Sequence, residues 1–201
     1  MSMILGLTGD VGAGKSTISR VWREMGAEVF DADSTAKDLW FREDIQKEAE
    51  KRWGEGFFSC EKSELLKKLA DKIFNCDEEY EFASELLHEA TIEELKNKAL
   101  NSSAELVIVE IPLLFECGRP EWIEGVIYVA APIEKRAERN KSRGWDCEEL
   151  IRREEHLIPR EEKMASADWI LVNRGSCEEW TEQGRTMGKS FLKLASERAK
   201  A

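Results

Sequence analysis

The feature that most constrains this chain is a glycine-rich stretch near its beginning, GDVGAGKST at residues 9–17. It fits the phosphate-loop pattern G-x-x-x-x-G-K-[ST]. Glycines bring bare amide groups close to a ligand, and successive N–H groups form a concave anion site. A helix that begins after Gly14 would add the positive end of its dipole. The pattern therefore predicts a site for nucleotide phosphates, in which Lys15 reaches the outer phosphates and Ser16 offers its hydroxyl to Mg²⁺.

The sequence on either side fits the strand–loop–helix context that this motif needs. Residues 3–8, MILGLT, form an apolar run typical of a buried parallel strand. After the loop, apolar side chains recur at the spacing of one helix face, and Gly26 then stops the helix. These side chains are Ile18, Val21, Trp22 and Met25. We therefore favour a phosphate loop over the alternative, a tight turn that carries Lys and Ser by chance.

Length and composition limit what the rest of the chain can be. Its 201 residues suffice for one sizeable domain, with room for a subdomain. We find no apolar run of membrane length, and the N-terminus lacks the charged region of a signal peptide. The formal net charge is −11, and an acidic surface repels nucleic acid phosphates. We expect a cytoplasmic protein without a membrane or nucleic-acid partner; its oligomeric state stays open, with a monomer favoured.

Cysteine and histidine usage argues against a metal-binding or disulfide-stabilised fold. The 5 cysteines are scattered and form no C-x-x-C pair, and the only histidines are His88 and His156. Free thiols in a reducing cytosol explain this pattern, and we expect no zinc site.

Further apolar runs predict the other strands of a parallel sheet, at residues 27–30, 106–109, 126–130 and 169–172. Acids follow two of them: Asp31 and Asp33 come after the second strand, and Glu110 after the third. The carboxyl ends of parallel strands form the edge where ligands bind, so these acids are candidate site residues. Asp31 and Asp33 would point the same way if the strand continued through both. The alternative is that Asp33 only caps the next helix, which we expect at residues 34–40.

Between the second and third strands, residues 41–103 predict a helical block. One apolar face contains Leu65, Leu69 and Ile73 with the neighbouring Leu66 and Phe74, and another helix or two carries Tyr80, Leu86, Leu87 and Leu95. The block could hold an acceptor substrate, or it could be a structural cover. His88 lies here, and a lone histidine is more often a helix-surface residue than a catalyst. We assign residues 1–40 and 104–201 to a nucleotide-binding core and 41–103 to an acceptor subdomain.

A basic segment, about residues 132–165 of the core, is a candidate lid. Pro132 opens a helix in which Arg136, Arg139 and Arg143 share one face, and little apolar surface accompanies them. A weakly packed helix of this kind could close over a triphosphate and spread its developing charge. The alternative, a solvated face with Glu134 and Glu138 as partners, is favoured by composition alone.

Two more helices complete the prediction. One is charged and runs from Cys147 to about Leu157, before Pro159. The final helix places Trp180, Met187, Phe191 and Leu194 on one side.

Taken together, the motifs resemble the dephospho-coenzyme A kinase family over nearly the whole chain. The matching stretches are residues 6–17, FDAD at 30–33, IPLLFE at 111–116, the pair Arg139 and Arg143, and Ala167-Asp168 followed by Asn173 and Gly175. The resemblance implies ATP-dependent phosphorylation of the 3′-hydroxyl of dephospho-coenzyme A, the last step of coenzyme A synthesis. It implies an α/β P-loop NTPase core of three layers with a five-stranded parallel sheet, a helical substrate-binding insertion and an arginine-bearing helical lid.

The resemblance also implies roles for single residues, and it favours the lid interpretation of the arginines. Gly12, Ala13, Gly14, Lys15, Ser16 and Thr17 bind the phosphates of ATP, with Mg²⁺ at Ser16. Lys15, Asp33, Arg139 and Arg143 are the catalytic candidates, and Asp33 accepts or orients the acceptor hydroxyl. Asn173 and Gly175 form part of the adenine pocket. His88, Glu110, Pro112 and Leu113 lie on the acceptor side.

The chain departs from the family pattern at four positions, three of them in or near the acceptor side. They are Glu110 in place of Asp, Glu89 in place of Pro after His88, Leu66 in place of Arg, and His156 in place of Gln. Two rival interpretations remain: another P-loop small-molecule or nucleotide kinase, and a non-catalytic ATP-binding regulatory protein. A guanine-nucleotide switch is disfavoured because the chain lacks an N-K-x-D motif.

Overall fold

The computed structural model describes residues 2–199, which form two compact units. One unit holds the chain up to Asp31 and from Lys98 onward, and we call it the core unit. The other, Ala32–Asn97, is the helical unit. Within residues 2–199, no helix combines the length and the apolar character needed to cross a lipid bilayer.

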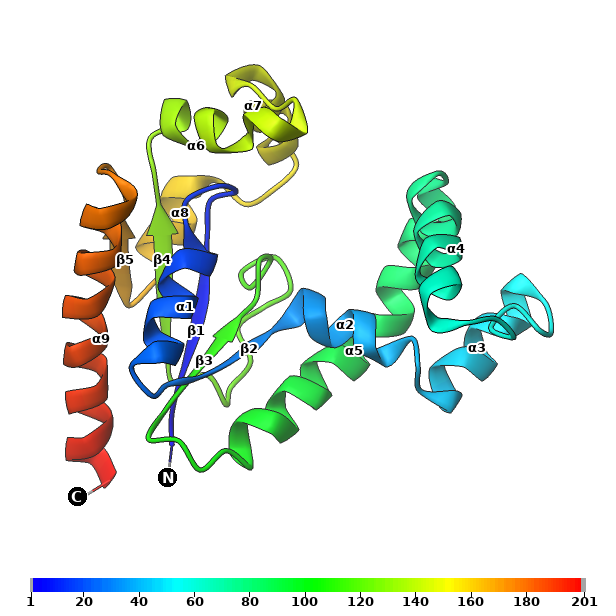
Figure 1. Ribbon diagram of the computed structural model, residues 1–201, viewed down its shortest axis with the longest axis horizontal. Coiled ribbons are helices and arrows are strands. Elements are labelled where there is room, and N and C mark those ends of the chain that lie inside the picture. Colours follow the sequence, from blue (N-terminus) through cyan, green and yellow to red (C-terminus); the bar gives the residue numbers. More distant parts are fainter. Residues whose placement is uncertain (1, 200–201) are drawn as a thin grey trace. The chain divides into compact units, whose positions relative to one another are not determined.

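The core unit is built on a parallel sheet whose strand order, among the described residues, is β2-β3-β1-β4-β5 (Figure 1). The strands are β1 (Met3–Gly9), β2 (Glu28–Asp31), β3 (Leu106–Glu110), β4 (Gly125–Ala130) and β5 (Trp169–Val172). The pairings β1–β3, β1–β4, β2–β3 and β4–β5 are all parallel, so the carboxyl ends of the strands meet at one edge. The predicted α/β core with a five-stranded parallel sheet is confirmed.

The helices of the core unit pack against this sheet or lie beyond its carboxyl edge. They are α1 (Lys15–Glu24), α6 (Ile133–Asn140), the 3₁₀ turn η1 (Lys141–Arg143), α7 (Cys147–Glu154), α8 (Arg160–Ala165) and α9 (Cys177–Ala199). The predicted charged helix at residues 147–157 ends at Glu154, and the short helix α8 was not predicted. Six residues are too few to show a helical period, which explains why α8 left no clear pattern in the sequence.

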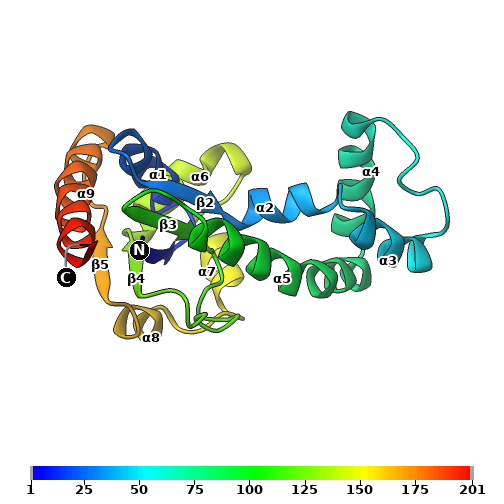
Figure 2. The same ribbon diagram turned by 90° about the horizontal axis from the view of Figure 1, so that it is seen from below.

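The central strand β1 is packed on both faces. Leu5 belongs to a hydrophobic cluster with Trp22 of α1 and Phe191 of α9. On the opposite face, a Cβ at Gly6 would lie 3.1 Å from Leu114, in the connection that follows β3. Figure 2 shows this connection and α8 on the other side of the sheet from α1. Layers on both faces therefore hold the middle of β1, the strand that leads into the glycine-rich loop.

The packing of α9 corrects one sequence prediction. Trp180 and Phe191 are buried and Met187 packs against the same cluster, as expected. Leu194, however, is 41% exposed, and Ala195 occupies the buried position instead. In so long a helix the buried stripe shifts by a residue over several turns, because 3.6 residues per turn do not match a fixed spacing.

The position of Asp33 also differs from the expectation. β2 ends at Asp31 and α2 (Ala32–Leu39) begins at the next residue, so Asp33 lies in the first turn of a helix. The strand does not continue through both acids, so the alternation of a strand does not point their side chains the same way. β2 pairs with β3, which separates it from β1.

The helical unit contains α2, α3 (Glu43–Trp53), α4 (Lys62–Phe74) and most of α5 (Asp77–Leu100). As predicted, Leu65, Leu69 and Ile73 are buried on one face of α4. Leu66 and Phe74 are exposed, at 40% and 73%, so they do not belong to that face. The apolar residues from Tyr80 to Leu95 lie on the single helix α5, and Tyr80 itself is 49% exposed. The core of the unit consists of Leu39, Trp40, Ile45, Ala49, Leu65, Leu69, Ile73 and Ala83.

We predict that Trp22→Ala strongly destabilises the core unit. The Trp22 ring is fully buried, meets Phe191 edge to face at 5.6 Å and donates from Nε1 to the Gly184 carbonyl at 2.8 Å. Its loss should lower the free energy of unfolding by about 3–5 kcal/mol, measured by urea denaturation followed by circular dichroism. The exposed Leu194→Ala should change it by less than about 0.5 kcal/mol. Equal losses in the two variants would show that the α1–α9 interface does not carry the stability assigned to it.

Candidate active site

The glycine-rich loop connects β1 to α1 at the carboxyl edge of the sheet. Gly12 and Gly14 have φ values of +74° and +103°, in the region that side chains disfavour. A Cβ at Gly12 would lie 2.2 Å from Nδ2 of Asn140, and a Cβ at Gly14 would lie 2.7 Å from Nδ2 of Asn173. Both the backbone conformation and the close packing therefore require glycine at these two positions.

Donors from distant segments bind the carbonyl groups of this loop. Asn173 donates from Nδ2 to the Ala13 carbonyl at 2.8 Å, and Trp180 donates from Nε1 to the Gly14 carbonyl at 3.1 Å. Arg139 donates to the Gly12 carbonyl at 3.1 Å and to the Ala13 carbonyl at 3.3 Å. Peptide groups are planar, so fixing these carbonyls also fixes the orientation of the N–H groups bonded to them. The loop is thus held in one shape before any ligand binds.

Lys15 and Ser16 stand at the start of α1. The Lys15 ammonium donates to the carbonyls of Gly9 and Asp10, at 3.0 and 3.1 Å, which places its charge back over the loop. Ser16 is exposed in the first turn of the helix. One turn later, the buried Ser19 donates from its hydroxyl to Glu110 at 2.9 Å, which joins the end of β3 to α1. Helix α1 therefore presents the Lys15 ammonium and the Ser16 hydroxyl beside the loop. The Glu110 carboxylate lies next to α1.

Asp10 is a buried acid inside the loop. Its carboxylate accepts hydrogen bonds from the Tyr128 hydroxyl at 2.6 Å, the Ala131 amide at 3.0 Å and Nε of Arg160 at 3.2 Å. Asp10 is 4% exposed. Burial, and then the hydrogen bond to Asp10, raise the pKa of the Tyr128 hydroxyl well above its usual range, so Tyr128 remains a donor.

The basic segment at about residues 132–165, the candidate lid that we call the lid segment, is joined to the phosphate loop by ion pairs. Arg136 on α6 is 3% exposed and binds the Glu154 carboxylate through two contacts of 2.5 and 3.2 Å. Its Nε also lies 3.9 Å from the Asp10 carboxylate. The prediction that α6 is weakly packed, with three arginines on one face, is therefore wrong. α6 ends at Asn140, Arg136 points inward, and buried polar contacts replace the missing apolar surface.

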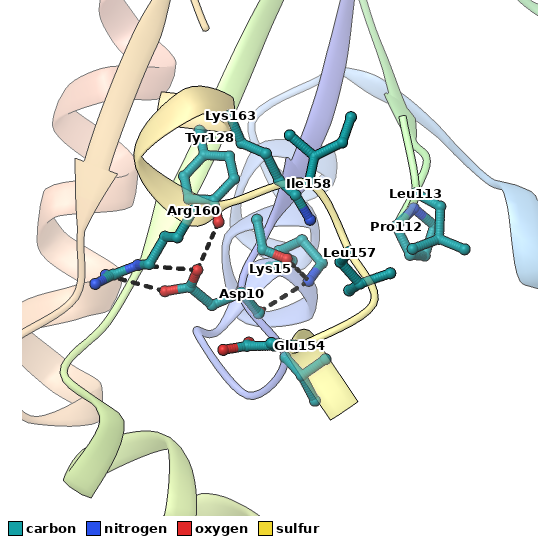
Figure 3. A pocket seen from close by; sticks show the side chains of 12 residues that line it. Asp10, Lys15, Pro112, Leu113, Tyr128, Glu154, Leu157, Ile158, Arg160 and Lys163 are labelled. Atoms are coloured by element: carbon teal, nitrogen blue, oxygen red, sulfur yellow. Dashed lines mark hydrogen bonds and ion pairs between the residues drawn. The ribbon is translucent and has the colours of Figure 1, made fainter. Parts of the chain in front are cut away.

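A cavity of about 90 Å³ lies between the loop, the end of β3 and the lid segment. Figure 3 shows Asp10, Lys15 and Arg160 at its wall. The other lining residues are Gly9, Val11, Pro112, Leu113, Tyr128, Glu154, Leu157, Ile158 and Lys163. Lys163 also forms an ion pair with Glu116 of the connection after β3. The cavity thus combines apolar walls with charged groups beside Lys15.

The core unit brings most of the predicted residues together. The phosphate loop, Pro112 and Leu113 meet at the cavity or beside it, and Arg139 contacts the loop. Arg143 lies in η1, where it faces Asn140 at 3.4 Å and the Trp145 ring at 5.3 Å. Asn173 is 2% exposed behind the loop, and Gly175 lies in the turn before α9.

Asp33 and His88 lie in the helical unit, on α2 and α5, and both are exposed. Because the loop belongs to the core unit, the geometry of that unit includes neither of these two residues.

Several residues at the site were not predicted. Asp10, Ser19, Tyr128, Glu154, Arg160 and Lys163 act through contacts between segments far apart in the chain. Only Asp10 carried a signal, because it is an acid within a loop that the sequence predicts to bind anions. The others stand in ordinary strand or helix positions, where nothing local distinguishes them.

Comparisons with known proteins cover most of this chain. The family model for dephospho-CoA kinase matches residues 3–179. A dephospho-CoA kinase from Aquifex aeolicus is 36% identical over 181 residues, covering 89% of this chain and 92% of the relative. A solved structure from Thermus thermophilus is similar with a TM-score of 0.72 and 33% identity, covering 96% of this chain and 98% of that one.

A more distant structure shows how widely this architecture is shared. Shikimate kinase from Acinetobacter baumannii, solved in complex with shikimate, has a TM-score of 0.53 and 15% identity, and it covers 98% of this chain and 95% of its own. At that identity the likeness shows the P-loop kinase fold alone. The sequence match and the Thermus structure span the glycine-rich loop, the sheet and the lid segment alike. On this evidence the chain belongs to the dephospho-CoA kinase family.

Proposed function

We propose that this protein transfers the γ-phosphoryl group of ATP to the 3′-hydroxyl of dephospho-coenzyme A, which gives coenzyme A and ADP. The observation that carries the proposal is the family match over residues 3–179. It is supported by the glycine-rich loop, whose carbonyl groups are held by hydrogen bonds from distant segments. Lys15 adds a cation at that loop.

The residues at the start of α1 fit a magnesium-bound nucleotide. Mg²⁺ keeps several waters and takes few protein ligands beside the phosphates, so one hydroxyl, that of Ser16, suffices on the protein side. Within residues 2–199 no cluster of three or more His, Cys, Asp or Glu side chains could hold a metal by itself. When bound, Mg²⁺ neutralises charge on the outer phosphates. We propose that the backbone of residues 12–17 holds the phosphates and that Asn173 and Gly175 border the adenine.

The acceptor is assigned to the helical unit and to the edge of β3. Asp33, exposed in the first turn of α2, is proposed to orient the acceptor hydroxyl. His88 on α5, and Glu110, Pro112 and Leu113 at the end of β3, are proposed to contact the acceptor. We keep the assignment of the inserted helices to acceptor binding; the helical unit begins at Ala32 and thus includes α2.

The reaction needs positioning and charge neutralisation more than covalent chemistry. The acceptor oxygen forms a bond to the γ-phosphorus while the bond from that phosphorus to the bridging oxygen of ADP breaks. The transition state is loose, so the hydroxyl proton leaves late, and Asp33 receives it. Lys15 stabilises charge on the outer phosphates, and Arg139 and Arg143 do so from the lid segment.

A coupled ADP-release assay with dephospho-coenzyme A tests the proposal directly. We expect Mg²⁺-dependent turnover that stops when EDTA removes the metal. Turnover with nucleoside monophosphates but not with dephospho-coenzyme A would assign the protein to another small-molecule kinase. ATP binding without transfer to any acceptor would assign it a regulatory role.

We predict that Lys15→Ala lowers kcat/KM by an amount equal to about 3–4 kcal/mol of transition-state stabilisation, because a preorganised cation is lost from the phosphate site. Steady-state kinetics in the ADP-release assay measures the change. Lys193→Ala, on the exposed side of α9, is the matched control and should match the wild type. A Lys15→Ala variant with near-normal kcat/KM would contradict the assigned phosphate site.

We predict that Asp33→Asn lowers kcat by about 10²–10⁴-fold, the usual worth of a positioned acid or base. The KM for ATP should change by less than about threefold, because Asp33 does not bind the nucleotide. Asp38→Asn, an exposed change of the same kind on the same helix, is the control and should leave kcat unchanged. Normal turnover in Asp33→Asn would show that another group orients the acceptor.

A further inference from the structure

The phosphate loop contains a negative charge that a phosphate site would not be expected to hold. Asp10 follows the first glycine of the motif, and its side chain is 2% exposed. It lines the same cavity as Lys15, and its own carbonyl accepts a hydrogen bond from the Lys15 ammonium. An ionised carboxylate at this position would repel a polyphosphate unless a cation compensates it.

Arg160 is the cation that lies nearest to this carboxylate. One of its terminal nitrogens lies 3.1 Å from Oδ2 of Asp10, its Nε donates to Oδ1 at 3.2 Å, and it also donates to the Ala131 carbonyl at 3.3 Å. Arg136 is farther away at 3.9 Å, and its guanidinium is already bound to Glu154 through two contacts. Among the described residues, the other guanidinium within 4.0 Å of the Asp10 carboxylate is that of Arg136, which is shared with Glu154.

The pair also connects two parts of the site. Asp10 belongs to the loop after β1, and Arg160 is the first residue of α8. Figure 3 shows the two side chains meeting at the cavity wall, with Tyr128 bonded to the same carboxylate. Two contacts between a planar guanidinium and a carboxylate fix orientation as well as distance.

We propose that Arg160 is a positioning residue for nucleotide binding: it neutralises Asp10 within the phosphate loop. This inference rests on the proposed use of the loop for a nucleotide, but not on the identity of the acceptor. Its test is therefore the equilibrium binding of Mg·ATP in the absence of any acceptor, measured by titration calorimetry.

The decisive comparison is between the single variant Arg160→Met and a double variant that also removes the charge of Asp10. Arg160→Met keeps the volume and removes the cation, and Arg160 is 37% exposed at its side chain, so the change should not prevent folding. We expect the Kd for Mg·ATP to rise about tenfold, within the range of coupling between neighbouring charged groups. In the double variant Asp10→Asn with Arg160→Met there is no charge left to compensate, and the Kd should return to within about threefold of the wild type. A role limited to packing predicts the reverse, since two lost contacts would then weaken binding more than one.

Two controls complete the experiment. Arg160→Lys retains the cation without the planar geometry and should bind Mg·ATP within about threefold of the wild type. Arg119→Met breaks a different ion pair, with Asp168 at the amino end of β5, and should lower thermal stability while leaving the Kd unchanged. The proposal is overturned if Arg160→Met binds Mg·ATP as the wild type does, or if the double variant binds no better than Arg160→Met. Absence of turnover on dephospho-coenzyme A would reject the proposed function but would leave these binding results interpretable.

Discussion

Hydrogen bonds to the carbonyl groups of the phosphate loop are the interactions on which the site depends. Three successive carbonyls, at Gly12, Ala13 and Gly14, accept hydrogen bonds from Arg139, Asn173 and Trp180. A loop with two glycines in the left-handed region has a high conformational entropy when unfolded, so it needs such restraints to keep one shape. The donors come from α6, from the end of β5 and from α9, and the loop therefore takes its shape only when the sheet is complete.

Negatively and positively charged side chains alternate around this loop. From α7 to α8 the order is Glu154, Arg136, Asp10 and Arg160, and each carboxylate has a guanidinium beside it. Buried ions are costly unless they are paired and hydrogen-bonded, so this pairing allows charged groups to be buried at the inner side of α6. It also fixes the inner side of α6 while Arg139 remains exposed toward the loop. The inner side of the lid segment is thus held by ion pairs, while its outer side carries exposed basic side chains.

Much of this arrangement could be predicted from the sequence. The glycine-rich motif located the loop, and the apolar runs located the strands to within a residue or two, because buried parallel strands are apolar without alternation. Several errors occurred where burial had to be inferred from helical spacing, and others at the end of β2 and at the short helix α8. Phe74 and Leu194 are apolar but exposed, and Arg136 is charged but buried. Periodicity shows that a helix has an apolar and a polar face, but it does not show which side chains are buried against another element.

The sequence by itself determined the motif, the sheet that presents it and the family to which the chain belongs, because each depends on residues that are close together or on local runs of one type. Only the tertiary structure decided how the loop is held and how its charge is balanced. Asp10 and Arg160 are 150 positions apart, and Ala13 and Asn173 are 160 apart. Contacts of this kind leave no periodic signal, because they arise when strands and helices that fold locally are brought to one edge of the sheet.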